Sequence, residues 1–230
     1  MVRTALLSTG FAALAAAAPL SLVQRQVECA TGFYIIVARG SNQPEGEGTP
    51  GEVGNLIEAR VSGSYSVAVD YPAAIISADS IYPTSVADGQ NDVTQKIEDY
   101  VEACGSDSKI VLVGYSQGGN VMTNVLAGGV AKPAPIDSKY KSNIKAVVVF
   151  GDPTFSEGQS FNEGTSTTDG IFSRRDDGDS LELLNTYASV LKSYCDEGDP
   201  YCSSDNDSSV HSATVSKYAQ DAADFAASKA

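Results

Sequence analysis

The chain has 230 residues, of which 42% are hydrophobic and 19% are charged, a composition typical of one globular α/β domain with a sizeable core. Its formal net charge of −14, from 15 basic and 29 acidic residues, argues against nucleic acid or an anionic membrane as the main partner. The same charge disfavours strongly anionic substrates.

The amino terminus has the pattern of a secretory signal peptide. Arg3 precedes an apolar run, Ala5–Ala17, that ends in small residues. The run is shorter than the roughly 18 apolar residues of a membrane-spanning helix, so a membrane anchor is disfavoured. The sequence therefore predicts a signal peptide over residues 1–18, a candidate short pro-segment over 19–28 and a secreted, extracellular domain over 29–230.

Apolar, β-branched runs predict five strands: Phe33–Ala38, Ser66–Val69, Ile110–Val113, Ala146–Phe150 and Val190–Tyr194. Apolar residues recur at helical spacing in two further segments, at Val93, Ile97, Val101 and Cys104 and at Val215, Tyr218, Ala219, Ala222 and Phe225. Apolar strands that alternate with helices indicate a mostly parallel five-stranded sheet covered on both faces, within a single α/β domain.

The segment Gly46–Gly51, GEGTPG, matches the G-x-G-x-x-G pattern of dinucleotide-binding proteins, and Asp70 follows at a suitable distance. However, the first glycine lies well past the strand end expected at Ala38, and Glu47 would bring a negative charge towards a pyrophosphate. A secreted protein also meets little nicotinamide cofactor. A loop before a helix is the better interpretation, and no cofactor is expected.

The segment Gly114–Gly118, GYSQG, fits the G-x-S-x-G pattern of a nucleophile elbow. It follows an apolar run and precedes a helix expected from Gly119 to about Leu126. A sharp strand-to-helix turn would project the Ser116 hydroxyl above the sheet, and glycines are needed where side chains would collide with neighbouring backbone. The first N–H groups of the helix would then point at the reacting centre. The pattern predicts Ser116 as a nucleophile; the alternative is a glycine-rich turn that closes a buried strand.

A serine needs a base to act as a nucleophile, and His211 is the only histidine of the chain. It follows a polar run and opens the last predicted helix, which favours a catalytic role over a place in the core. It also comes after Ser116 and after a cluster of acids. This order of serine, acid and histidine is the one found in α/β-hydrolases.

Several carboxylates are candidates for the group that orients His211. Asp196, Glu197 and Asp199 lie together in CDEGDPYC, and Asp152 follows another predicted strand. The acid fixes the tautomer of the imidazole, so it must be held rigidly. Asp199, between a glycine and a proline, has the most constrained backbone and is favoured, whereas Asp196 and Glu197 are interpreted as solvated loop acids.

The four cysteines are Cys29, Cys104, Cys195 and Cys202. An even number in a secreted protein indicates two disulfides, for which three pairings are open. In one of them Cys195 and Cys202 close a short loop, which leaves Cys29 for Cys104. A metal site is disfavoured because no Cys-x-x-Cys occurs and histidine is scarce, so no metal is expected.

GYSQGG, the CDEGDPYC loop and the single histidine after it resemble the cutinase and acetylxylan esterase family of secreted serine esterases, over the chain from about Cys29 to its carboxyl end. The resemblance implies a three-layer sandwich of the lidless α/β-hydrolase type and hydrolysis through an acyl-enzyme. The residues it implies are the nucleophile Ser116, the acid Asp199, the base His211 and the disulfides Cys29–Cys104 and Cys195–Cys202.

The segment VARGSNQ resembles the strand end that forms the oxyanion hole of cutinases. By this resemblance Ser41 would donate its N–H and its hydroxyl, and the N–H of Gln117 would complete the hole. Ser41 is otherwise an ordinary loop serine.

The substrate is less well defined by the sequence. GDPTF, SFNEGT and KSYCDEGDPYC resemble acetylxylan esterases, whereas ARGS resembles cutinases. The segment between Cys202 and His211 is short and polar, unlike the longer apolar loop of cutinases that act on plant polyester. Ile75, Ile76 and Ile81 would either meet a waxy substrate or lie in the core. We expect short acyl esters on neutral plant polysaccharide, with cutin as the alternative.

A catalytically silent secreted binder or elicitor on the same fold is the alternative from another functional class. It is disfavoured because all three residues of the expected triad are present. The protein is expected to be a monomer, and Asn206 begins a candidate N-glycosylation sequence.

Overall fold

All five predicted strands are present in the structure, a computed structural model that describes residues 1, 27–76, 81–129 and 132–230. The strands are β1 Tyr34–Ala38, β2 Tyr65–Ala68, β3 Ile110–Tyr115, β4 Ile144–Phe150, β5 Asn162–Glu163 and β6 Leu191–Tyr194. They form one sheet in the order β2-β1-β3-β4-β6-β5, and every neighbouring pair is parallel. The predicted signal peptide and most of the candidate pro-segment lie outside the described residues.

The sheet has six strands instead of the five predicted. The additional strand, β5, consists of Asn162 and Glu163, which pair with Ser193 and Tyr194 of β6 at the edge of the sheet. Two polar residues form no apolar run, so hydrophobic patterning could not reveal this strand. The other strands differ from the prediction only at their ends; β4, for example, begins at Ile144 instead of Ala146.

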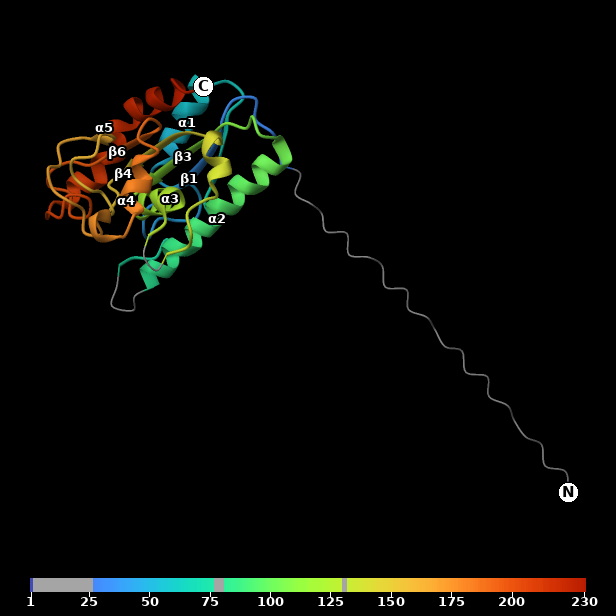
Figure 1. Ribbon diagram of the computed structural model, residues 1–230, viewed down its shortest axis with the longest axis horizontal. Helices are drawn as coiled ribbons and strands as arrows, with labels where there is room; N and C mark the ends of the chain where they lie inside the picture. Colours follow the sequence, from blue (N-terminus) through green and yellow to red (C-terminus); the bar gives the residue numbers. More distant parts are fainter. Residues whose placement is uncertain (2–26, 77–80, 130–131) are drawn as a thin grey trace.

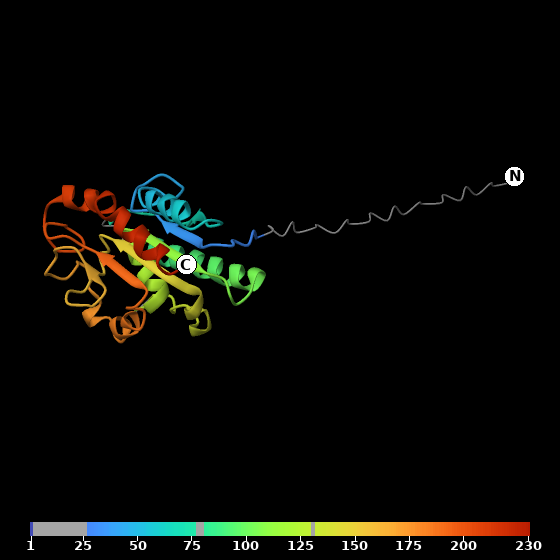
Figure 2. The same cartoon turned by 90° about the horizontal axis from the view of Figure 1, so that it is seen from above.

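Helices cover both faces of the sheet, as predicted (Figure 1). The α-helices are α1 Gly51–Arg60, α2 Ile81–Cys104, α3 Gln117–Ala127, α4 Ser180–Asn185 and α5 Ser208–Ala227, and short 3₁₀ helices span Ser138–Asn143 and Arg174–Asp176. α1 and α5 pack together on one face, and α2 and α3 pack together on the other. Figure 2 shows α5 lying across β4 and β6.

The central strands are apolar on both faces because both faces are covered. In β1, Ile35 and Val37 pack with α1 and α5, whereas Ile36 packs with α2 and α3, and all three are fully buried. Such strands read as continuous apolar runs instead of alternating patterns. This three-layer α/β arrangement confirms the predicted fold class, and it places the carboxyl ends of the parallel strands at one edge of the sheet.

Two disulfides fasten the chain at distant points. Cys29 before β1 is bonded to Cys104 at the end of α2, and Cys195 after β6 is bonded to Cys202, seven positions further on. This is the pairing that the family resemblance implied. The first disulfide closes a long segment of chain and the second closes a short loop, so both reduce the conformational freedom of the unfolded state.

The segment GEGTPG is a loop that ends where α1 begins at Gly51. The amide oxygen of Gln43 accepts hydrogen bonds from the N–H groups of Gly40 (3.0 Å) and Thr49 (3.2 Å), which ties the loop to the end of β1. The prediction of a loop before a helix is therefore confirmed.

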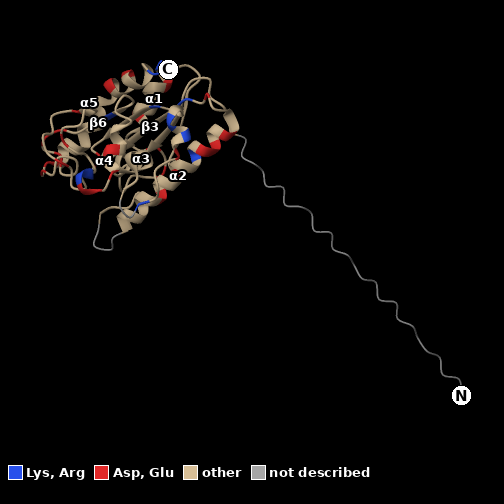
Figure 3. Cartoon of the chain, in the orientation of Figure 1, with Lys and Arg blue, Asp and Glu red and all other residues tan. Residues whose placement is uncertain are grey.

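Acidic residues are spread over several elements, among them α2 and α4, whereas lysine and arginine are fewer (Figure 3). Within the described part of the chain, no helix combines the length and the hydropathy that crossing a bilayer requires.

Candidate active site

Ser116 lies at a sharp turn between β3 and α3. Its φ of 56° and ψ of −119° are unusual for a residue with a side chain, and such a conformation costs about 1–3 kcal/mol. A Cβ atom on Gly114 would collide with the backbone of Gly118, and one on Gly118 would collide with the backbone of Ala38. The predicted elbow is therefore present, and α3 begins at Gln117, earlier than expected.

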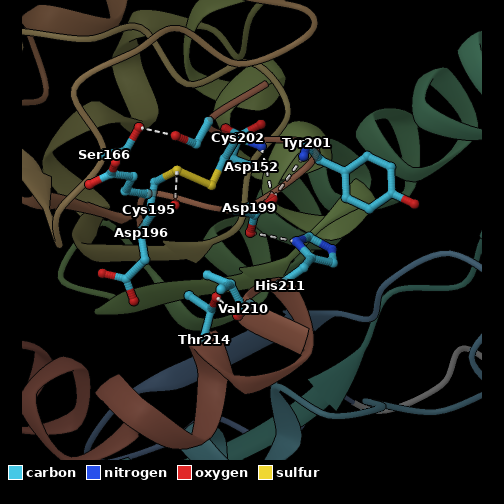
Figure 4. The surroundings of a disulfide bond; sticks show 12 residues. Asp152, Ser166, Cys195, Asp196, Asp199, Tyr201, Cys202, Val210, His211 and Thr214 are labelled. Carbon is cyan, nitrogen blue, oxygen red and sulfur yellow. Dashed lines mark hydrogen bonds and ion pairs between the residues drawn. A yellow bond between two sulfur atoms is a disulfide. The ribbon is translucent and has the colours of Figure 1, made fainter. Parts of the chain in front are cut away.

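The imidazole of His211 bridges Ser116 and Asp199. Nε2 of His211 lies 3.0 Å from Oγ of Ser116. On the other side of the ring, Nδ1 lies 2.7 Å from Oδ2 of Asp199 (Figure 4). His211 sits in the first turn of α5, whose N-terminus is capped by the Asp207 carboxylate. His211 was predicted to lie outside the core. It is nevertheless only 7% exposed, because Asp199 and the surrounding loops cover it.

Asp199 is fully buried and held from both oxygens. Oδ1 accepts hydrogen bonds from the N–H groups of Tyr201 (2.8 Å) and Cys202 (3.1 Å), which leaves Oδ2 for His211. The Cys195–Cys202 disulfide closes the loop that carries Asp199, Tyr201 and Cys202. The rigid support expected for the acid is therefore provided by the backbone of its own loop.

Asp196 is not the solvated acid that the sequence indicated. It is 5% exposed, and it accepts hydrogen bonds from Nζ of Lys217 (2.6 Å) and from the Tyr218 hydroxyl (2.7 Å) on α5. Burial acts to raise the pKa of Asp196, but these hydrogen bonds outweigh it and the pKa is lowered. Asp196 anchors the loop to α5, whereas Glu197 is exposed, as expected.

Asp152 also has partners other than His211. It is 2% exposed, and its carboxylate accepts hydrogen bonds from the hydroxyl groups of Thr123 (2.8 Å) and Thr154 (2.8 Å). Thr123 belongs to α3, so Asp152 connects the end of β4 to the helix that follows Ser116. Of the four candidate acids, Asp199 is the one that reaches the imidazole.

Three residues around His211 were missed in the sequence. The Tyr115 hydroxyl donates to the backbone oxygen of His211 (3.3 Å), and the ring of Tyr201 meets the imidazole edge-on with centroids 4.6 Å apart. Gly151 has a φ of 59°, and a Cβ atom there would lie 2.7 Å from Cε1 of His211. Tyr115 therefore holds the backbone of His211, Tyr201 packs against the imidazole, and Gly151 leaves room for it. The one sign of this arrangement in the sequence is Gly151 in GDP, directly after a strand.

Replacing Gly151 by alanine should therefore push the imidazole away from Ser116. We expect kcat to fall by about 10–100-fold, because a displacement near 1 Å misaligns proton transfer. Gly158→Ala is the matched control, since Gly158 also has a positive φ, 80°, but nothing lies within 4 Å of the added carbon. The measurement is kcat on p-nitrophenyl acetate for both variants; equal activities would show that Gly151 does not position His211.

Of the predicted oxyanion-hole residues, Gln117 directly follows Ser116 in the elbow and Ser41 lies just after β1. Ser41 lines the same cleft as Ser116, and its hydroxyl donates to the backbone oxygen of Ala74 (3.2 Å). Gln117 is the first residue of α3, so its N–H has no carbonyl partner within the helix. An N–H group in this position can bind a developing negative charge.

The side chain of Gln117 has a structural task that the sequence did not indicate. Its amide nitrogen donates to the backbone oxygen of Ala74 (2.6 Å), and its amide oxygen accepts from the Ser85 hydroxyl (2.9 Å). Ser85 in turn accepts from the N–H of Ala74 (3.0 Å). The loop opposite Ser116 is thus bound to α2 and α3 through Ala74.

The triad opens into a cleft of about 420 Å³. Its lining residues are Ser41, Gln43, Ile75, Ile76, Tyr82, Tyr115, Ser116, Pro153, Tyr201 and His211. The sequence did not decide whether Ile75, Ile76 and Ile81 lie in the core or at the surface; all three are exposed, at 53%, 47% and 52%.

Among the described residues, no cluster of His, Cys, Asp and Glu side chains has the arrangement of a metal site.

This arrangement has the components for attack on an ester. The imidazole can take the proton of the Ser116 hydroxyl, and the Asp199 carboxylate can stabilise the imidazolium. The residue after Ser116, Gln117, begins α3 with an N–H group that has no partner within the helix. A family model described as Cutinase matches residues 29–230. The chain belongs to the cutinase family. It is accordingly a carboxylic ester hydrolase with an α/β fold.

Individual members of the cutinase family are similar over most of the chain. An acetylxylan esterase of Hypocrea jecorina is 34% identical to this chain, and the alignment covers 96% of this chain and 74% of the esterase. Cutinase 11 of Verticillium dahliae is also 34% identical, over 95% of this chain and 75% of that cutinase. The solved catalytic core domain of acetyl xylan esterase from Trichoderma reesei is 33% identical, with a TM-score of 0.79, and covers 88% of this chain and 100% of that domain.

Proposed function

We propose that the enzyme hydrolyses esters through a covalent acyl-enzyme on Ser116. His211 takes the proton from Oγ as the oxygen attacks the ester carbonyl, and it then gives this proton to the departing alcohol. A water molecule, deprotonated by the same imidazole, releases the acid and restores Ser116. The observation that carries the proposal is the continuous chain of contacts from Ser116 through His211 to Asp199, at 3.0 Å and 2.7 Å.

The N–H groups of Ser41 and Gln117, together with the Ser41 hydroxyl, are proposed to hold the oxyanion. Ser41→Ala should then lower kcat by about 10²–10³-fold, with a smaller change in KM, because the hydroxyl is needed mainly in the transition state. The measurement is steady-state kinetics on p-nitrophenyl acetate. A loss below about threefold would mean that the hydroxyl only ties the loop at Ala74.

The proposed substrate is an acetyl ester on a neutral plant polysaccharide such as xylan. Support comes from the acetylxylan esterases among the similar proteins and from the cleft, whose volume of about 420 Å³ suits a short acyl group beside a sugar. The negative charge of the chain disfavours an anionic polymer.

Cutin is the second candidate, and one observation favours it. Ile75 and Ile76 line the cleft and are 53% and 47% exposed, so a waxy surface would cover apolar area that now faces water. The similarity to Cutinase 11 of Verticillium dahliae points the same way.

The experiment that separates the two substrates compares initial rates on p-nitrophenyl esters of acetate, butyrate and decanoate, and then product release from acetylxylan and from cutin. We expect the highest kcat/KM with acetate, and acetate release from the xylan. Release of hydroxy fatty acids from cutin without release of acetate would contradict the proposed substrate and support the second candidate.

We further propose that residues 29–230 form the mature, secreted domain and that it acts as a monomer. The family model begins at Cys29, and two disulfides fit an oxidising compartment. Asn206 is exposed and lies next to Asp207, the cap of α5, so a glycan could be attached there.

A further inference from the structure

A second cavity, of about 360 Å³, adjoins the catalytic cleft and is not used by the reaction described above. Tyr82 lines both spaces. The chain also passes directly from one to the other, since Pro153 lines the cleft and Thr154 lines the cavity. We call it the α2–α3 cavity, because these helices and the loop that contains Phe172 form its walls.

One wall of the α2–α3 cavity is aromatic and apolar. The rings of Tyr82 and Phe172 lie with centroids 5.7 Å apart, tilted by 44°, and Phe172 is 42% exposed. The other apolar residues of the lining are Pro83, Val86, Ala87 and Pro133. A large aromatic side chain held at an open cavity is suited to pack against an apolar face of a ligand.

The rest of the lining is polar and includes a buried donor without an acceptor. Asn124 is fully buried; its Oδ1 accepts from Nη2 of Arg174 (2.6 Å) and from Nδ2 of Asn120 (3.1 Å). Nδ2 of Asn124 has no partner among the described residues. A buried donor without a partner is unfavourable, so a ligand hydroxyl that accepted its hydrogen bond would be favoured.

The charges around the cavity favour a neutral ligand. Lys132 lines it, but Nζ lies 2.5 Å from Oδ2 of Asp177, so the positive charge is already paired. Asp176 adds an exposed carboxylate to the lining. A sugar acid would meet this carboxylate, whereas a neutral sugar would not be repelled.

We propose that the α2–α3 cavity binds a neutral pyranose ring of the polysaccharide whose ester is cleaved; this inference rests on the proposed function. A pyranose has an apolar C–H face for Tyr82 and Phe172, and hydroxyl groups at its edge for Asn124 and Thr154. An alkyl chain of similar size would leave Nδ2 of Asn124 unpaired. The ring would hold the polymer while a neighbouring residue presents its acetyl group to Ser116.

The first test compares an acetylated xylotetraose with p-nitrophenyl acetate, which is too small to span both spaces. Phe172→Ala removes the aromatic wall and Ala87→Leu fills the cavity. In both variants kcat/KM for the oligosaccharide, divided by that for p-nitrophenyl acetate, should fall about 2–10-fold, through KM. Ile171→Ala is the matched control, since Ile171 is similarly exposed, at 41%, and is not part of the lining.

The second test measures binding without hydrolysis, so that it stands apart from the proposed substrate. Unacetylated xylotetraose is titrated calorimetrically into Ser116→Ala, and into the same protein with Phe172→Ala added. We expect binding that the second substitution weakens by the same 2–10-fold. Absence of binding, or equal affinity in both proteins, would overturn the inference even if acetylxylan is a substrate. A selective loss on p-nitrophenyl decanoate would also overturn it, in favour of an acyl chain.

Discussion

Ser116→Ala should lower kcat on p-nitrophenyl acetate by about 10⁴–10⁶-fold, because the hydroxyl oxygen forms the covalent bond to the acyl group in the proposed reaction. The fold should persist: the substitution removes one oxygen at the elbow and leaves the glycines that permit the turn unchanged. Circular dichroism and the melting temperature check the fold.

The matched control for this variant is Ser212→Ala. Ser212 is an exposed serine beside His211, and its hydroxyl donates to the backbone oxygen of Ser208 (2.9 Å). Its loss should change kcat less than about twofold, as is usual for surface positions. If Ser116→Ala retained a rate near that of the control, the nucleophile would have to be another group.

The second large effect is expected for Asp199→Asn, with a loss of about 10⁴-fold in kcat. An amide has nearly the volume of the carboxylate, so the hydrogen bonds from Tyr201 and Cys202 can persist. The neutral amide cannot stabilise the imidazolium of His211, and it can hold the ring in the wrong tautomer.

Asp196→Asn separates catalysis from loop support in the same CDEGDPYC segment. Asp196 is nearly as well buried as Asp199, but its partners on α5 are Lys217 and Tyr218 instead of His211. We expect a lower melting temperature and nearly unchanged kcat. The assignment of the acid would be wrong if Asp196→Asn lost activity and Asp199→Asn kept it, measured by kcat and by thermal unfolding.

That Ser116, His211 and Asp199 would lie together could be predicted because each is marked in the local sequence. Ser116 stands in a pattern typical of a tight strand-to-helix turn, and the glycines on both sides do prevent backbone collisions. His211 could be named because the chain has one histidine. Asp199 could be preferred because its neighbours restrict the backbone. Local sequence was sufficient wherever the constraint was local.

The errors have the opposite cause, since they depend on partners that are distant in sequence. The burial of Asp196 follows from Lys217 and Tyr218, which α5 brings to it from 21 and 22 positions away. β5 exists because Asn162 and Glu163 lie beside β6, and no apolar pattern marks them. The close fit of Gly151 to His211 also appears only when β4 and α5 are placed together.

The central claim is that Ser116 becomes a nucleophile because His211 and Asp199 converge on it in the fold. The most direct measurement is mass spectrometry of peptides after reaction with diethyl p-nitrophenyl phosphate. This reagent transfers its diethylphosphoryl group to an activated serine and releases p-nitrophenol. We predict one diethylphosphoryl group, on the peptide that contains Ser116, in the wild-type protein and none in His211→Gln. A label on another residue, or equal labelling of Ser116 in His211→Gln, would contradict the activation of Ser116 by His211.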